Sequence, residues 1–271
     1  MKRTRFFLKI AAMLALVSLA AGAQTATGAE NSGPHNPVYY EFLFTPPAQN
    51  PIHNDERPWN FGVLAQTGFG VTEDRGGFKF LMAGVRAGKV LTGMHGRGIA
   101  RGNFELGVEI FPFWQSYTPT TQRQNCVNQI VGSTVSCSAA FPIGGTFTGV
   151  SITPAVLRWN FAGTKRFTPW VQGAGGVLWT NHKYPAFGGP AANALGGQGL
   201  YFTLGDNGPN DDASVWNFTP QFGVGVHYFV RSRRSLDLGA NAIHISSASL
   251  GDKNPGVNAS VQFTVGYSWW K

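Results

Sequence analysis

The sequence has few charged residues, which make up 13% of the chain against roughly 25% in a typical globular protein. Disordered chains are rich in charge and poor in apolar residues, so this composition argues against disorder. Glycine is abundant, with 36 of 271 residues, and there are 16 prolines. Because both residues interrupt helices, the composition excludes a coiled coil and argues against an ordinary helical enzyme.

Cysteine is scarce, since Cys126 and Cys137 are the only two and are separated by ten residues. A redox pair would have the closer CxxC spacing. In an exported chain, two such cysteines indicate a disulfide that closes a loop. The isolated histidines show no metal-ligand spacing, so no metal site is predicted.

Long apolar runs are absent after the first 23 residues, which excludes a later membrane-spanning helix. Those 23 residues have a basic start, an apolar stretch and a small-residue cleavage site, and we interpret them as a secretory signal peptide. Residues 24–57 hold several prolines and asparagines and are interpreted as an N-terminal periplasmic segment. The signal carries four basic residues and no acid, so the net charge falls from +8 to +4 and gives no indication of nucleic-acid binding.

What the chain has instead is alternation of apolar and polar residues with period two. Eight segments show it: 59–70, 78–90, 103–114, 146–161, 168–180, 214–230, 235–246 and 257–270. The third and fifth segments are followed by long connections, and the fourth and sixth by short ones. Outer-membrane barrels have such long external loops and short periplasmic turns. We therefore predict an all-β fold, an eight-stranded antiparallel transmembrane β-barrel over residues 58–271.

The eight tryptophans fall at the ends of these segments. Trp114, Trp179 and Trp216 lie at the predicted external ends and the other five at the periplasmic ends, where indole prefers the membrane interface. This sorting favours a lipid-facing barrel over a secreted sandwich or a lipocalin-like barrel. Side chains fill so narrow a barrel, and an open pore is not expected. The polar residues phased inward are Arg86, Glu105, Glu109, Gln221, His227, Asp237 and Gln262.

His244 and Ser246 lie together on the outward row, near the external end of the seventh segment. Residues two apart on a strand point the same way, about 6–7 Å apart. The imidazole is thus placed to act as base for the hydroxyl, which is the minimal unit of nucleophilic acyl transfer. A histidine on a lipid-facing row is costly unless it has a function. The alternative is an interfacial polar pair without catalysis.

The stretch from His244 to Asn258, HISSASLGDKNPGVN, resembles the active-site segment of the lipid A 3-O-deacylase and acyloxyacyl hydrolase-like family. That resemblance implies an eight-stranded outer-membrane barrel that hydrolyses an ester-linked acyl chain of lipid A. It also implies a Ser-His-Glu triad on the outside of the barrel and no cofactor. Ser246 would be the nucleophile and His244 the general base, and Ala248 also matches the family pattern His-x-Ser-Asn-Ala.

Two positions depart from that pattern. Ser247 stands where the family usually has Asn, a residue associated with the oxyanion site, and Asn258 stands where the triad Glu is expected. An Asn carbonyl can orient an imidazole but cannot stabilise the imidazolium by charge. A regular strand would also point Asn258 inward, away from His244. Asp252 is an alternative acid.

We therefore predict an outer-membrane esterase that removes an acyl chain from lipid A, with its active site toward the outer leaflet. Ser246, His244 and Asn258 would be catalytic, with Ser247 and Ala248 as oxyanion support. The expected partners are lipopolysaccharide as substrate and outer-membrane lipids, without nucleic acid, and the oligomeric state stays open. The other hypothesis is a non-catalytic small barrel that serves adhesion, envelope integrity or ligand binding, which the missing Glu favours.

Overall fold

The computed structural model describes residues 50–53, 56–72, 75–123, 126–128, 135–137, 139–184, 214–247 and 258–271. The predicted signal peptide and most of the segment 24–57 lie outside the described residues, as do Ala248 and Asp252. Within the described ranges, we find no helix with the length and apolar character needed to cross a membrane.

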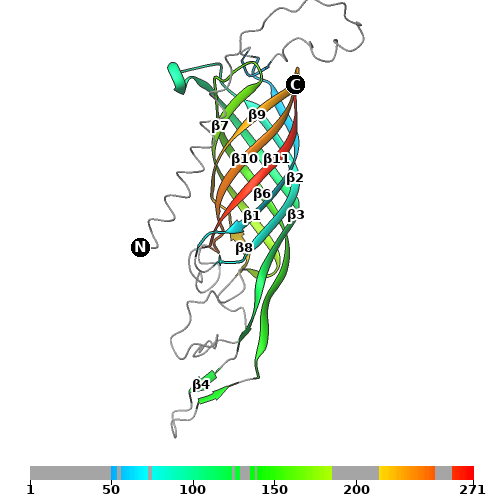
Figure 1. Cartoon of the computed structure of the whole chain (residues 1–271), viewed down its shortest axis with the longest axis vertical. Coiled ribbons are helices and arrows are strands. Elements are labelled where there is room, and N and C mark those ends of the chain that lie inside the picture. Colours follow the sequence, from blue (N-terminus) through cyan, green and yellow to red (C-terminus); the bar gives the residue numbers. More distant parts are fainter. Residues whose placement is uncertain are drawn as a thin grey trace, which may run out of the picture. The chain divides into compact units, whose positions relative to one another are not determined.

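Antiparallel strands close into a barrel (Figure 1). The wall strands are β1 (Trp59–Gly70), β2 (Lys79–Val90), β3 (Gly102–Arg123), β6 (Phe141–Phe161), β7 (Phe167–Tyr184), β8 (Ser214–Phe218), β9 (Gln221–Arg231), β10 (Arg234–His244) and β11 (Ala259–Trp270). Neighbours along the chain pair with one another, and β1 pairs with β11 to complete the circle. Since β8 and β9 share one place in the wall, the barrel has eight strands and the predicted fold class is confirmed.

The wall strand made by β8 and β9 is interrupted at Pro220. Proline has no N–H to give to a ladder, so a strand breaks there. The register against β10 does not change across the interruption, because Gln221 pairs with Ile243 and Phe218 pairs with Ser246. The interruption therefore leaves a local gap in the hydrogen bonding of an otherwise continuous strand.

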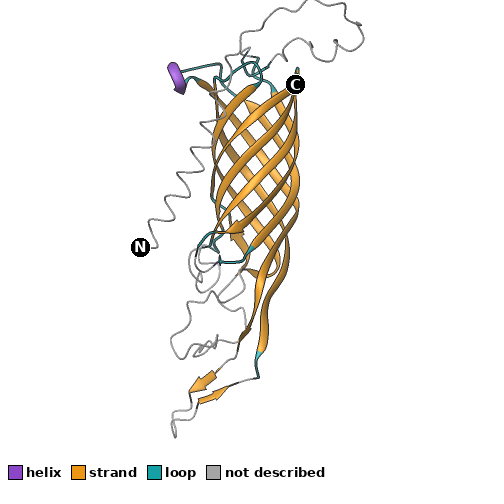
Figure 2. Ribbon diagram, viewed as in Figure 1, coloured by secondary structure: helices purple, strands orange, loops and turns teal. Residues whose placement is uncertain are grey.

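The predicted loop 115–145 is largely strand. β3 and β6 continue as a hairpin beyond the other wall strands (Figure 2). The sequence of this stretch shows no regular apolar alternation, which is why the sequence predicts a loop there. The short strands β4 (Cys126–Asn128) and β5 (Val135–Cys137) pair with Cys126 opposite Cys137. This register suits a disulfide, since the Cα separation of facing residues, about 4.5–5.5 Å, lies within the range that a disulfide spans, and the bond itself stays a prediction.

Side chains alternate between a mostly apolar exterior and a filled interior. The predicted inward residues Arg86, Glu105, Glu109, His227, Asp237 and Gln262 are buried, and Gln221 is half-buried. We call the end of the barrel with the connections 91–101, 162–166 and 232–233 the short-turn end, and the opposite end the long-loop end. An apolar cluster fills the interior toward the long-loop end: Leu64, Phe78, Phe80, Met82, Phe111, Trp114, Phe147, Leu178, Tyr184, Ile243 and Ile245.

Three tryptophans that we assigned to the interfacial belts lie inside the barrel, which corrects that prediction. Trp114, Trp170 and Trp270 are at most 3% exposed. A register shift in β3 between Phe111 and Trp114 moves the Trp114 side chain to the inner face. Trp269 and Trp270 are consecutive and must face opposite sides of a strand. The tryptophans on the exterior are Trp59, Trp179, Trp216 and Trp269, with Trp159 half-buried.

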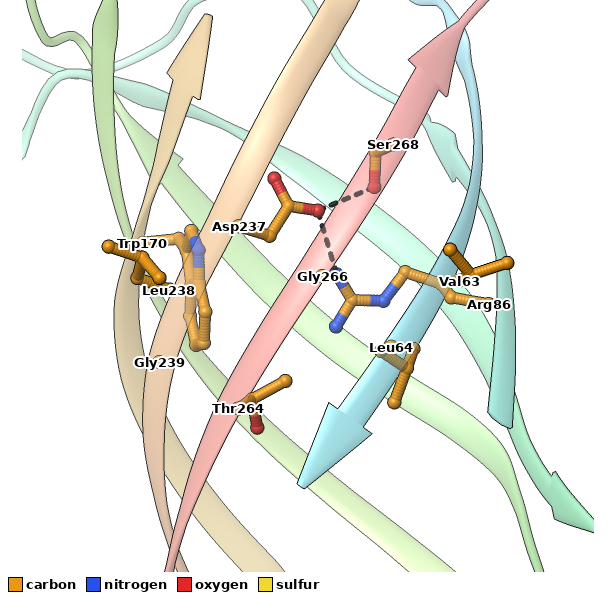
Figure 3. Close-up of a pocket in the computed structure, with 10 residues that line it drawn as sticks. All are labelled: Val63, Leu64, Arg86, Trp170, Asp237, Leu238, Gly239, Thr264, Gly266 and Ser268. Atoms are coloured by element: carbon orange, nitrogen blue, oxygen red, sulfur yellow. Dashed lines mark hydrogen bonds and ion pairs between the residues drawn. The ribbon is translucent and has the colours of Figure 1, made fainter. Parts of the chain in front are cut away.

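Buried charges occupy the interior toward the short-turn end. Asp237 accepts hydrogen bonds from Ser235, Ser268 and His227 Nδ1, the last at 2.6 Å, and lies 3.8 Å from Arg86 Nη1. Figure 3 shows Arg86 and Asp237 facing each other across a small cavity. Arg86 also pairs with Glu109. These charges are therefore paired and hydrogen-bonded, as buried charges must be.

Arg158 belongs to this network, although the sequence analysis did not place it inside. It is 3.8 Å from Glu105 Oε1, and its guanidinium lies 4.3 Å from the ring centre of Trp170. Gly225 and Gly239 make room for that indole, because a Cβ at either position would come within 2.7 Å of its ring atoms. The two glycines thus leave space for the Trp170 side chain in the narrow interior of the barrel.

Residues 50–53, ahead of the first strand, close the short-turn end of the interior. Asn50 Nδ2 donates to Thr168 Oγ1 at 2.6 Å, and Asn50 Oδ1 accepts from the Ile52 amide at 3.0 Å. Ile52 is buried in a cluster with Val90, Phe229 and Trp270. This part of the segment 24–57 therefore packs onto the barrel.

Candidate active site

His244 and Ser246 share the outer face of the wall near the long-loop end. β10 ends at His244, and the alternation continues beyond it: Ile243, Ile245 and Ser247 are buried, while His244 and Ser246 are half-buried. The structure thus places the two residues on one face, as their spacing predicts.

Main-chain hydrogen bonds hold both residues against the interruption in the neighbouring wall strand. The His244 amide donates to Pro220 O at 3.0 Å. Ser246 exchanges two main-chain bonds with Phe218, at 2.6 and 3.0 Å. A paired backbone restricts the direction of the side chains it carries, so the imidazole and the hydroxyl project from a fixed frame.

The His244 imidazole is oriented by a main-chain group. Its Nδ1 lies 3.0 Å from the carbonyl oxygen of Asn258. A carbonyl oxygen only accepts hydrogen bonds, so Nδ1 carries the proton of the neutral ring. Nε2 is then the basic nitrogen, which is the tautomer that a general base needs.

The Asn258 side chain points the other way. Asn258 is 2% exposed, and neither atom of its amide has a hydrogen-bond partner among the described residues. The inward direction is the one that we expected for a regular strand. The structure therefore brings the main chain of Asn258, and not its amide, to His244. Sequence reasoning missed this contact, because a carbonyl is common to every residue type.

The structure describes one of the remaining predicted residues of this site, and it does not bring that residue to the side of the wall that carries His244 and Ser246. Ser247 is 1% exposed and lies on the face opposite Ser246. Ala248 and Asp252 fall between 248 and 257, outside the described residues. No group of His, Cys, Asp or Glu suited to a metal ion occurs in the part of the chain that the structure describes.

The outer surface beside the pair is apolar and aromatic. Trp216, Phe218 and Phe222 on β8 and β9 are between 41% and 58% exposed. On the other side, Phe69 and Phe263 contact each other with ring centres 6.4 Å apart. A hydroxyl and an imidazole are thus set into a surface that a hydrocarbon chain can cover, which suits hydrolysis of an acyl ester.

Comparison with known proteins gives one family match. The model of the lipid A 3-O-deacylase (PagL) family matches residues 102–268, more than half of the chain, and this range includes His244, Ser246 and Asn258. A search of curated proteins gives no match.

The solved structures that are similar include two outer-membrane proteins. The crystal structure of the outer membrane enzyme PagL is 16% identical, with 77% of this chain and 98% of that chain covered and a TM-score of 0.39. The outer membrane protein OprG from Pseudomonas aeruginosa is 10% identical, with 79% and 96% covered and a TM-score of 0.35.

Proposed function

This chain belongs to the lipid A 3-O-deacylase (PagL) family, and we propose that it cleaves an ester-linked acyl chain of lipid A with Ser246 as nucleophile and His244 as general base. The hydrogen bond from His244 Nδ1 to the Asn258 carbonyl is the observation that carries this assignment. It leaves Nε2 as the base on the face from which Ser246 projects.

The reaction would follow the usual steps of a serine esterase. Nε2 of His244 takes the Ser246 proton while Oγ forms a bond to the ester carbonyl carbon. The tetrahedral intermediate collapses, the C–O bond to the sugar breaks, and the imidazolium gives its proton to the leaving alkoxide. Water, activated by the same imidazole, then hydrolyses the acyl-enzyme and releases the fatty acid.

The Asn258 carbonyl would take over orientation of the ring from the family's Glu. Its partial negative charge stabilises the imidazolium less than a carboxylate does, so we expect a slow enzyme. Ser247 and Ala248 follow the nucleophile directly, and we propose that this segment supports the oxyanion.

The site lies near the long-loop end of the barrel. We propose that this end faces the cell exterior, because long loops are external in outer-membrane barrels. The Ser246 hydroxyl would then lie at the depth of the outer leaflet, where lipid A is found.

Mass spectrometry of lipid A tests the proposal, with Ser246→Ala and His244→Ala each expected to lower deacylation by about 10³-fold or more. The double variant should be no worse than either single one, because the two residues act as a unit. Ser232→Ala and His95→Ala are matched controls at the short-turn end and should keep full activity. Wild-type protein that leaves every acyl chain in place would favour the non-catalytic barrel, and activity in Ser246→Ala would discard this site.

A further inference from the structure

The connection between β2 and β3 holds an isoleucine away from the rest of the protein. Ile99 lies in the 3-10 turn η2 (Gly98–Ala100) and is 98% exposed, more than any other large apolar side chain among the described residues. Figure 2 shows this turn projecting sideways from the rim of the barrel. Single exposed apolar residues are common, so its surroundings decide whether Ile99 has a role.

The loop that carries Ile99 is closed at its base. His95 and Gly102 exchange main-chain hydrogen bonds of 2.7 and 2.9 Å, and the Arg101 amide donates to Gly98 O at 3.2 Å. Gly98 has a φ of 57°, which favours glycine there. The Arg101 carbonyl also accepts from Ala162 in the next turn, at 2.7 Å. The exposure of Ile99 is therefore a built feature of the loop.

Basic side chains are numerous at the same end of the barrel as this loop. We call ten residues at the short-turn end the basic rim: Arg57, Lys89, Arg97, Arg101, Lys165, Arg166, Arg231, Arg233, Arg234 and Lys271. All of them are exposed or half-buried. Glu56 is the exposed acidic side chain among the described residues of this end, and it pairs with Arg233, while Glu105 and Asp237 are buried in the interior. The described part of this end thus carries a large excess of positive charge.

Aromatic side chains on the outer wall place the basic rim at the level of a membrane interface. The Lys89 ammonium lies 5.1 Å from the ring centre of Trp59, and Arg166 Nη1 lies 3.5 Å from the Tyr228 hydroxyl. Aromatic residues at the ends of barrel strands sit at the depth of lipid headgroups. Cations beside them therefore lie where headgroup phosphates are, and long basic side chains reach such groups readily.

We propose that the basic rim and Ile99 form a docking surface for anionic glycerophospholipids of the periplasmic leaflet. The arginine and lysine side chains pair with headgroup phosphates, and Ile99 inserts between the acyl chains beside the barrel. This proposal depends on the short-turn end facing the periplasm and not on the assignment of Ser246 and His244. A deacylation assay therefore tests one proposal and a lipid-retention assay the other.

Lipid retention is the first test. The mature protein is placed in nanodiscs of phosphatidylcholine and phosphatidylglycerol. The protein is then released from the nanodiscs, and the lipids that stay bound to it are counted by native mass spectrometry. We expect several-fold enrichment of phosphatidylglycerol on the wild type and at least a twofold loss of it in Arg97→Gln/Arg101→Gln. Lys79→Gln/Lys183→Gln removes the same charge from the long-loop end and should keep the enrichment. Equal retention in both double variants would overturn the proposal.

Insertion of position 99 is the second test. A fluorophore on Ile99→Cys, in a Cys126→Ser/Cys137→Ser background, should be quenched by vesicle lipids brominated on their acyl chains. The same label on Ser232→Cys, in a turn of the same end, should be quenched much less. Absence of quenching at position 99 would exclude insertion. Retention on purified peptidoglycan without a preference for phosphatidylglycerol would assign the basic rim to the cell wall and overturn the lipid proposal.

Discussion

The imidazole of His244 donates a hydrogen bond from Nδ1 to the main-chain oxygen of Asn258, across 3.0 Å. The ring is therefore oriented by a group that every residue type would supply at position 258. The orientation of His244 therefore does not depend on which side chain stands at position 258. Three substitutions of Asn258 test this.

Asn258→Ala should keep deacylation within about threefold of the wild type, because the substitution leaves in place the carbonyl that orients His244. The measurement is the rate of acyl-chain release from lipid A in vesicles. A loss of about 10²-fold or more would mean that the side chain reaches the imidazole.

Asn258→Glu restores the family residue and should nevertheless give no gain in rate. The new carboxylate would point inward, away from His244, at a position that is 2% exposed, where burying an additional charge is costly. We expect a lower unfolding midpoint in urea, with Asn258→Gln as the control of equal size. A faster enzyme would show that the chain entering β11 can turn this side chain outward.

Asp237→Ala should destabilise the barrel by about 3–5 kcal/mol, because it leaves three buried hydrogen-bond donors without their acceptor, at about 1–3 kcal/mol each, and leaves Glu109 as the carboxylate paired with Arg86. The donors are His227, Ser235 and Ser268, and Arg86 lies 3.8 Å away. Urea unfolding in lipid vesicles, followed by tryptophan fluorescence, measures the change. The control, Ser232→Ala in an exposed turn, should leave the unfolding midpoint unchanged. An unchanged midpoint in Asp237→Ala would mean that the network contributes nothing to stability.

Cys126→Ser/Cys137→Ser should leave the heat-modified mobility of the barrel unchanged, because β4 and β5 form a sheet separate from the wall. In the wild type, a maleimide reagent should label the cysteines only after reduction. Labelling without a reductant would show that the two thiols are free.

Chymotrypsin added to intact cells should cleave between residues 185 and 213, which contain several aromatic and leucine residues. Trypsin should spare the turn at Lys165 and Arg166, which we place in the periplasm. Peptide mapping reads both results. Cleavage at that turn in cells with an intact outer membrane would reverse the proposed orientation.

Much of the fold could be predicted from the sequence, because lipid outside and polar side chains inside impose an alternation that survives in β1, β10 and β11. The alternation fails where the backbone departs from a regular strand. The register shift in β3 turned Trp114 inward, and a shift in β6 between Ile152 and Ala155 hid the inward direction of Arg158. A slip in the alternation can indicate such a shift, but its position depends on the neighbouring strands and cannot be fixed from one sequence.

The part of the site that consists of side chains could be predicted from the sequence. The spacing of His244 and Ser246 gives their common face, since strand geometry fixes it. The partner of His244 could not be predicted, because it is a peptide carbonyl of another strand. From the sequence we expected the side chain at position 258 to orient the ring, whereas the group that reaches the imidazole from there is the main-chain carbonyl.

The cluster of Ile52 with Trp270 joins the beginning of the barrel to its last wall residue. During biogenesis, the side chains that Ile52 packs against come together only after β11 has paired with β1. A nascent chain that ends before Trp270 lacks part of this cluster. Ile52 would then be exposed at the short-turn end, and the end of the barrel that Asn50 helps to close would be incomplete. We therefore expect barrel closure and the packing of residues 50–53 to occur together, so that an incomplete barrel leaves this segment undocked.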